Sequence, residues 1–237
     1  MIDDILPYKI ISIVGSGGKT TLMYSLAQEL SQNGKKVIIT TSTKIFFPPA
    51  YPVILLQNHT ESSPADKERF LLDLSHSLEA NAICVTGILC EPHMEDERQK
   101  LCSFQASGIT ASQFLEVADY VLIEADGSKH MPLKFPNLNE PVIPDDSDMI
   151  IAVVGLWCIG RPIKEVCHRY ELACDFLASE YKRPVDSDHI VTCTDVKKIV
   201  CSPSGYKKNI KNRPFKIVAF SDKKIQIDFQ LQEGPLQ

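Results

Sequence analysis

The sequence lacks any apolar run that approaches the roughly 20 residues needed to cross a bilayer. It also lacks an excess of positive charge, because 25 Lys and Arg residues stand against 30 Asp and Glu residues, for a net charge of −5. We therefore expect no general affinity for nucleic acid. The N-terminal residues Met1–Asp4 lack the basic start of a signal peptide. These absences predict a cytoplasmic protein with neither a membrane nor a nucleic acid as partner.

The eight cysteines include no Cys-x-x-Cys pair, which excludes the spacings of zinc ribbons and thioredoxin-like motifs. In the cytoplasm most of them are expected to be reduced thiols. Cys84 and Cys158 lie in or beside apolar runs and are predicted core residues. Cys167 is the best candidate for a reactive thiol, because the neighbouring His168 and Arg169 would lower its pKa.

The strongest motif is an apolar, β-branched run followed by a glycine-rich turn and a helix start. The run covers residues 9–14, and the turn that follows reads Gly15, Ser16, Gly17, Gly18, Lys19, Thr20 and Thr21. Glycines permit positive φ and a close approach to a ligand, and the helix start favours an anion. Lys19 can reach terminal phosphate oxygens, and the Thr20 hydroxyl can hold Mg²⁺.

This turn is shorter than the common G-x-x-x-x-G-K-[ST] motif and resembles the phosphate loop of Mur-type ligases. It predicts a loop that binds the phosphates of ATP or GTP. The alternative is a glycine turn that merely joins strand to helix.

A second strand, over residues 35–40, ends in hydroxyl side chains and a lysine. Ligands of open parallel sheets bind at the carboxyl ends of the strands. Thr41 and Thr43 are therefore predicted to contact a substrate, and Lys44 is a candidate catalytic residue beside the phosphate loop. The alternative is a polar turn with solvated hydroxyls.

A third strand, over residues 120–123, runs into two carboxylates, Glu124 and Asp126. Residues two apart on an extended chain face the same side. Either Asp126 or Glu124 is predicted to bind Mg²⁺, directly or through water, and the other to orient or deprotonate the nucleophile; the preferred metal pair is Thr20 with Asp126. The alternative is a strand end followed by an Asp-Gly turn.

Basic residues follow in a proline-punctuated loop and near a later helix start. Lys129 and Lys134 are predicted to hold an anionic group of a small-molecule substrate. Arg169 is predicted either to contact phosphate or to pair with Glu171. His93 stands among acidic residues at a spacing that fits no metal motif, so a solvated loop is expected there.

Taken together, these motifs resemble the YqeC family, proposed accessory proteins of selenium-dependent molybdenum hydroxylases. The resemblance is carried by segments 15–21, 40–44, 124–129 with 132–134, and 140–144, and it continues through 154–156, 160–162 and 168–169. It implies a P-loop protein that acts in selenium cofactor biosynthesis or in maturation of the hydroxylase, with a hydroxylase or maturation protein as partner. The sequence departs from the expected pattern at residues 220–223, where an Asn-Lys-x-Asp-like base-reading segment is missing. ATP and GTP therefore both remain open.

The predicted fold class is α/β, with a mostly parallel sheet flanked by helices in a P-loop NTPase-like three-layer arrangement. One such domain is expected over residues 1–237, with an irregular part at 200–237. Mg²⁺-dependent nucleotide hydrolysis or phosphoryl or adenylyl transfer is the predicted activity. The alternatives are a nucleotide-gated switch that docks to a partner protein and a cysteine-based selenium or sulfur carrier.

Overall fold

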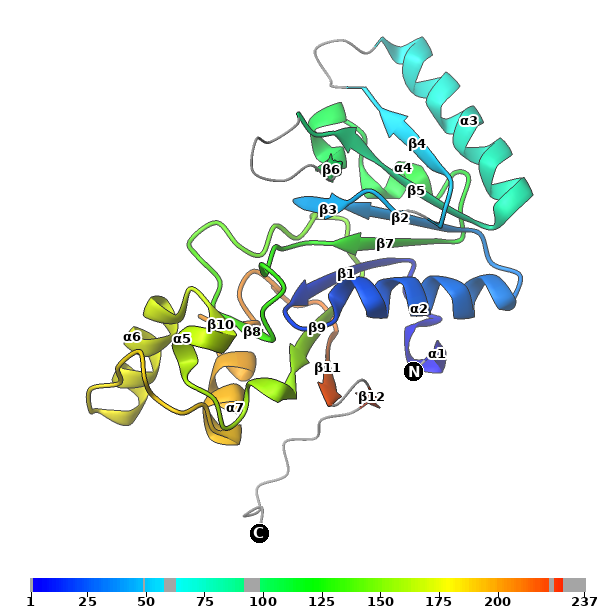
Figure 1. Cartoon of the computed structure of the whole chain (residues 1–237). Coiled ribbons are helices and arrows are strands. Elements are labelled where there is room, and N and C mark those ends of the chain that lie inside the picture. The colour runs from blue at the N-terminus through cyan, green and yellow to red at the C-terminus, as the bar shows by residue number, and fades with distance from the viewer. Residues whose placement is uncertain (1, 49, 58–62, 92–98, 222–223, 228–237) are drawn as a thin grey trace. The chain divides into compact units, whose positions relative to one another are not determined.

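The computed structural model describes residues 2–48, 50–57, 63–91, 99–221 and 224–227 (Figure 1). The predicted loop around His93 and the end of the chain after Ile227 lie outside these residues. Contacts divide the chain into two interleaved compact units. Unit 1 holds residues 1–13, 19–127 and 142–150, and unit 2 holds 14–18, 128–141 and 151–237. The prediction of one domain over the whole chain stays a prediction.

Unit 1 is built on a mostly parallel sheet. Its strands, in spatial order, are β1 (Ile10–Gly15), β7 (Tyr120–Glu124), β2 (Val37–Thr41), β5 (Ile83–Leu89), β6 (Lys100–Cys102) and β3 (Lys44–Phe46), and β4 (Val53–Leu56) also pairs with β5. The β1–β7, β7–β2, β2–β5 and β4–β5 pairs are parallel, whereas β5–β6 and β6–β3 are antiparallel. Strands β1, β2 and β7 are buried along their whole length, as central parallel strands should be. The predicted α/β class and mostly parallel sheet are confirmed.

The helices of unit 1 begin and end where local signals place them. They are α1 (Ile2–Ile5), α2 (Lys19–Gln32), α3 (Pro64–Asn81), the 3₁₀ turn η2 (Phe104–Ser107) and α4 (Ala111–Phe114). α3 starts with a capping box between Ser63 and Asp66, and Pro64 takes the first helical position, where a missing N–H costs nothing. At the start of α4, the amide of Thr110 donates to Oε1 of Gln113 at 3.0 Å, which ties the residue before the helix to its first turn.

The core of unit 1 lies between α3 and the sheet. Phe70, Leu74 and Leu78 recur along one face of α3 and pack into a buried apolar cluster. This cluster takes alternate residues from the strands, so side chains such as Ile38 and Val121 share one face of the sheet. Figure 1 shows α3 running beside β4 and β5.

Unit 2 is less regular. The strands β12 (Lys224–Ile227), β11 (Phe215–Ser221) and β9 (Met149–Gly155, in unit 2 from Ile151 on) lie in that order, and β8 (Leu133–Lys134) pairs in parallel with β10 (Cys167–His168). Its helices are η3 (Leu156–Cys158), α5 (Ile163–Val166), α6 (Tyr170–Tyr181) and α7 (Cys193–Cys201). The sequence indicated a helix start near Arg169 but not the extent of α6, because its N-cap position is Arg169 in the left-handed region rather than a Ser, Thr, Asp or Asn.

The cysteines correct one prediction. Cys84 and Cys158 are buried, as expected. Cys167 is only 1% exposed, and burial raises the pKa of its thiol, so the prediction of a reactive low-pKa thiol at this position is wrong. Six of the eight cysteines are free thiols, whereas Cys90 and Cys102 form a disulfide that the sequence did not predict. In the parts of the chain that the structure describes, no helix combines the length and apolarity that a bilayer crossing requires.

Two leucines of α3 test the location of the core. Leu74 is fully buried, whereas Leu72 on the same helix is 55% exposed. Leu74→Ala should lower the free energy of unfolding by about 2–5 kcal/mol, because it removes buried methyl groups and leaves a cavity. Leu72→Ala should change it by less than about 0.5 kcal/mol. Urea denaturation of both variants provides the measurement, and equal losses would place the core elsewhere.

Candidate functional site

A buried lysine lies between the two carboxylates that end β7. The Nζ atom of Lys19 is 3.1 Å from Oδ1 of Asp126 and 3.8 Å from Oε1 of Glu124. All three side chains are buried, with 9% or less of each exposed. Charges in such surroundings are costly unless they are paired. The structure thus brings together three residues that the sequence singled out from two separate motifs.

Hydroxyl groups complete this cluster. Oγ1 of Thr20 donates a hydrogen bond of 2.9 Å to Oε2 of Glu124. Oγ1 of Thr41 donates to the backbone carbonyl of Glu124 at 2.8 Å, and in turn accepts from the amide of Thr43 at 2.9 Å. The sequence predicted that the Thr20 hydroxyl binds a metal together with Asp126. In the structure this hydroxyl donates its hydrogen bond to Glu124 instead.

The register of the parallel strands explains why these residues meet. Thr41 on β2 and Ile13 on β1 both pair with Glu124 on β7. Because the carboxyl ends of parallel strands share one edge of the sheet, the polar ends of β2 and β7 lie side by side. Helix α2 begins at Lys19, just after β1, which delivers Lys19 and Thr20 to the same edge.

The glycine turn takes the conformation that its sequence predicts. Gly15, Gly17 and Gly18 have φ values of +92°, +79° and +126°. A Cβ on Gly17 would lie 2.6 Å from the amide nitrogen of Gly155 and 2.8 Å from the carbonyl oxygen of Pro132. Glycine is therefore required both for the backbone angles and for close contact with these segments of unit 2.

Ser16 ties the turn to the same part of unit 2. Its amide donates to the carbonyl of Val153 at 2.7 Å, and its hydroxyl donates to the carbonyl of Met131. The amide of Gly155 donates to Pro132 at 2.9 Å. The segment 131–132 is thus held directly against the glycine turn.

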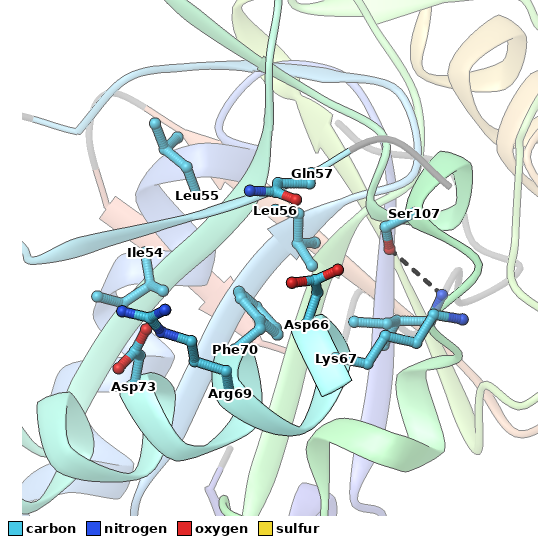
Figure 2. Close-up of a pocket in the computed structure, with 11 residues that line it drawn as sticks. Ile54, Leu55, Leu56, Gln57, Asp66, Lys67, Arg69, Phe70, Asp73 and Ser107 are labelled. Atoms are coloured by element: carbon cyan, nitrogen blue, oxygen red, sulfur yellow. Dashed lines mark hydrogen bonds between the residues drawn. The ribbon is translucent and has the colours of Figure 1, made fainter. Parts of the chain in front are cut away.

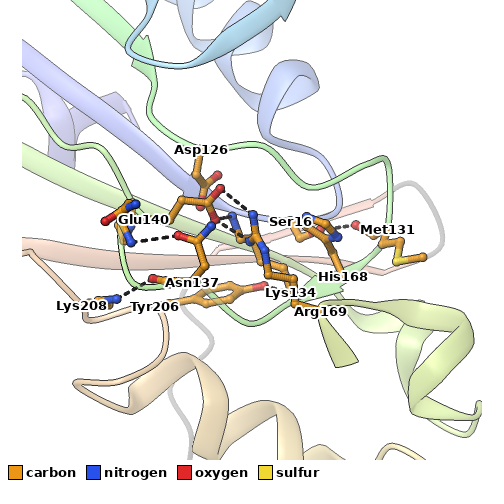
Figure 3. Close-up of polar contacts among 12 residues, drawn as sticks. Ser16, Asp126, Met131, Lys134, Asn137, Glu140, His168, Arg169, Tyr206 and Lys208 are labelled. Atoms are coloured by element: carbon orange, nitrogen blue, oxygen red, sulfur yellow. Dashed lines mark hydrogen bonds and ion pairs between the residues drawn. The ribbon is translucent and has the colours of Figure 1, made fainter. Parts of the chain in front are cut away.

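Two of the predicted basic residues form a second cluster around Glu140, a residue of the 140–144 segment for which no role in a site was predicted. Nζ of Lys134 is 2.7 Å from Oε2 of Glu140. Arg169 forks onto the same carboxylate, with Nη1–Oε2 and Nη2–Oε1 distances of 2.6 and 2.8 Å (Figure 3). The alternative that Arg169 pairs with Glu171 is therefore wrong. Glu140 is 29 residues from Arg169, so no local sequence pattern predicts this pair.

The remaining predicted residues take different positions. Lys134 is fully buried, and Tyr206 accepts a hydrogen bond from its amide. Lys129 is exposed and has a φ of +48°. Lys44 is exposed at the start of β3, where it pairs with Cys102 of β6. The roles predicted for these lysines stay predictions.

Electrostatics mark His168 as a further residue of the second cluster. Burial, and then the cations Arg169, Lys134 and Lys129, lower the pKa of His168 from 6.5 to about 4. Burial alone would raise the pKa of Glu140, but hydrogen bonds from Arg169 and Lys134 bring it below its usual value. At neutral pH the cluster therefore holds a neutral imidazole among charged side chains.

An aromatic pair lies near the first cluster. The rings of Tyr24 and Tyr51 stack with centroids 5.2 Å apart, and burial together with the Glu124 carboxylate raises the pKa of Tyr24 to about 12. Tyr24 follows Thr20 by one turn of α2, a spacing that could have drawn attention to it.

A pocket of about 360 Å³ lies elsewhere in unit 1, between the end of β4 and the start of α3 (Figure 2). Its lining is Ile54, Leu55, Leu56, Gln57, Asp66, Lys67, Arg69, Phe70, Asp73 and Ser107 with Ile109. None of the predicted site residues contributes to it.

These features define an α/β protein with a glycine-rich turn at a helix start and a buried lysine–carboxylate cluster at the carboxyl edge of its sheet. The model of the YqeC protein family matches residues 11–171. The uncharacterized protein YqeC of Escherichia coli (strain K12) is 32% identical over 203 residues, which cover 85% of this chain and 71% of that relative. The chain belongs to the YqeC family. No solved structure matches it.

The depressed pKa of His168 predicts a pH dependence of stability. In the unfolded chain His168 takes up its proton near its ordinary pKa of 6.5, but in the fold only near 4. Between these values the unfolded state binds more protons, so the free energy of unfolding should fall as the pH is lowered. Urea midpoints from pH 7 to 5 should show a smaller decline in His168→Gln than in the parent protein. Equal slopes would contradict the assignment.

Proposed function

We propose that this chain binds ATP or GTP together with Mg²⁺ and hydrolyses it or transfers its phosphoryl or adenylyl group. The observation that carries the proposal is the burial of Lys19 against Asp126 and Glu124, with the Thr20 hydroxyl bonded to Glu124. This is the side-chain set that Mg²⁺-dependent phosphoryl transfer uses: a lysine, a hydroxyl and acidic residues at a strand end.

The segment Gly15 to Thr21 would hold the phosphates. The first N–H groups of α2 have no acceptor within the helix, and the positive end of the helix favours a bound anion. The glycines at 15, 17 and 18 bend the backbone so that peptide N–H groups can converge. Lys19 would exchange part of its contact with Asp126 for the terminal phosphate oxygens.

The donor set fits magnesium. Mg²⁺ is usually bound by one or two carboxylates together with waters and substrate phosphates. Thr20 and Asp126 would hold the ion, and Glu124, through its hydrogen bond to Thr20, would keep that hydroxyl in place and orient the nucleophile. Within the described ranges no group of three or more His, Cys, Asp or Glu side chains is arranged to hold a metal by itself. Bound Mg²⁺ would neutralise charge that develops on the phosphates.

Its family gives this nucleotide chemistry a context. We propose that the chain acts as an accessory protein in selenium cofactor biosynthesis or in maturation of a selenium-dependent molybdenum hydroxylase. The support is the resemblance of its motifs to the YqeC family, to which the chain belongs.

Titration of the purified chain with ATP and with GTP, with and without Mg²⁺, tests the proposal by calorimetry. Lys19→Ala should weaken nucleotide binding about 100-fold or more, because a charged contact to phosphate is lost. Asp126→Asn should keep nucleotide binding but lose Mg²⁺-dependent hydrolysis. Lys164→Ala, which removes an exposed lysine paired with Asp188, is the control and should bind as the parent does.

Circular dichroism of each variant separates loss of binding from loss of fold. A folded Lys19→Ala variant that binds nucleotide as tightly as the parent protein would overturn the assignment of the phosphate site.

A further inference from the structure

In the cluster around Glu140, cationic side chains outnumber anionic ones near His168. The side chains that act on His168 include three cations, Arg169, Lys134 and Lys129, and one carboxylate, Glu140. His168 and Lys134 are register partners in the parallel β10–β8 pair, so both side chains leave the same face. The amide of Phe135 donates to the carbonyl of His168 at 3.0 Å, which holds the two strands together.

Arg169 keeps hydrogen-bonding capacity beyond its pair with Glu140. A guanidinium carries more N–H donors than the two that Glu140 accepts, and Arg169 remains 23% exposed. The carboxylate therefore orients the guanidinium without saturating it. Lys134 is fully buried and forms an ion pair with the same Glu140 carboxylate, so it helps to fix the position of that carboxylate.

The backbone at this cluster is held in an uncommon conformation. Lys129, His130 and Arg169 have φ values of +48°, +61° and +63°. Non-glycine residues in the left-handed region are few, and they concentrate at functional sites. Lys129 and His130 are the central residues of a turn that the amide of Met131 closes onto the carbonyl of Ser128 at 3.0 Å, and such a turn accounts for positive φ at both positions. Arg169 takes this conformation at the N-cap position of α6.

The cluster is also joined to the glycine turn within unit 2. The segment between Lys129 and Lys134 contains Met131, whose carbonyl accepts the Ser16 hydroxyl, and Pro132, whose carbonyl would contact a Cβ on Gly17. A ligand held by the basic cluster would therefore lie on the same unit as the turn assigned to the phosphates.

We propose that Arg169, His168 and Lys129 form a binding site for the anionic group of a second, small-molecule substrate. The ligand carries a carboxylate or a tetrahedral oxyanion. Glu140 and Lys134 are positioning residues, because they orient Arg169 and β8. The proposal that an anion binds here depends only on this cluster. The proposal that the bound anion accepts a phosphoryl group rests on the function proposed above.

The only tryptophan of the chain provides a probe. Trp157 packs against Gly155, whose amide is bonded to Pro132, so its fluorescence reports on this part of unit 2. The parent protein is titrated with succinate and, separately, with sulfate, each at constant ionic strength and with Mg²⁺ and a non-hydrolysable ATP analogue present. Saturation by succinate alone identifies a carboxylate ligand, and saturation by sulfate identifies a tetrahedral one.

Variants locate the bound anion. Arg169→Gln should weaken binding about 10- to 100-fold, because hydrogen bonds to a charged group are lost. Lys129→Gln changes an exposed side chain and should weaken binding several-fold without affecting folding. Arg161→Gln is the matched control, since Arg161 forms an exposed pair with Glu165 in the same unit, and it should bind as the parent does. Lys19→Ala should retain anion binding.

Other outcomes overturn the inference in distinguishable ways. Binding lost in Lys19→Ala but kept in Arg169→Gln and Lys129→Gln would place the anion on the phosphate loop, which overturns the second site and supports the first. A parent protein that binds nucleotide but neither anion overturns the second site alone. A parent protein that binds both anions but no nucleotide leaves the second site standing and overturns the proposed function.

Discussion

The contact of Lys19 with Asp126 and Glu124 is the interaction on which unit 1 depends at the carboxyl edge of its sheet. It links the first turn of α2 to the end of β7 across more than a hundred residues of chain, and all three charges are buried. Removing one partner of such a buried group typically costs about 3–5 kcal/mol, because the remaining charge stays desolvated. A protein that needed only stability would gain as much from apolar side chains here. The presence of buried charges at this edge therefore favours a site that handles charged ligands.

The two units arrange charged side chains in different ways. In unit 1, carboxylates and hydroxyls surround a single lysine, which suits a cation and the phosphates that accompany it. In unit 2, basic side chains surround Glu140, and burial together with the cationic neighbours lowers the pKa of His168, which keeps its imidazole neutral. The first arrangement supports nucleotide chemistry, and the second supports recognition of an anion. The thiol of Cys167 is buried and its pKa is raised, which argues against a cysteine-based carrier at this position.

Much of the fold could be predicted from local patterns. The strands over 53–56, 120–124 and 149–155 and the helix from Lys19 follow from apolar runs, periodicity and turn residues. The extent of the helix Tyr170–Tyr181 could not be predicted, because its start lacks a capping side chain. The antiparallel β6 and β3 strands are only three residues each, too short for an alternating pattern to identify.

For the candidate site, the sequence alone determined which residues are proposed to bind phosphate and metal, because Gly15 to Thr21, Glu124 and Asp126 stand in short, ordered motifs. It also determined the positive φ of the glycines, since that preference is local. Only the tertiary structure decided the partners. Strand register placed Thr41 beside Glu124, and folding brought Glu140 to Arg169 from 29 residues away. Pairings and pKa values depend on distances and burial across the chain, and no local pattern in a sequence contains those quantities.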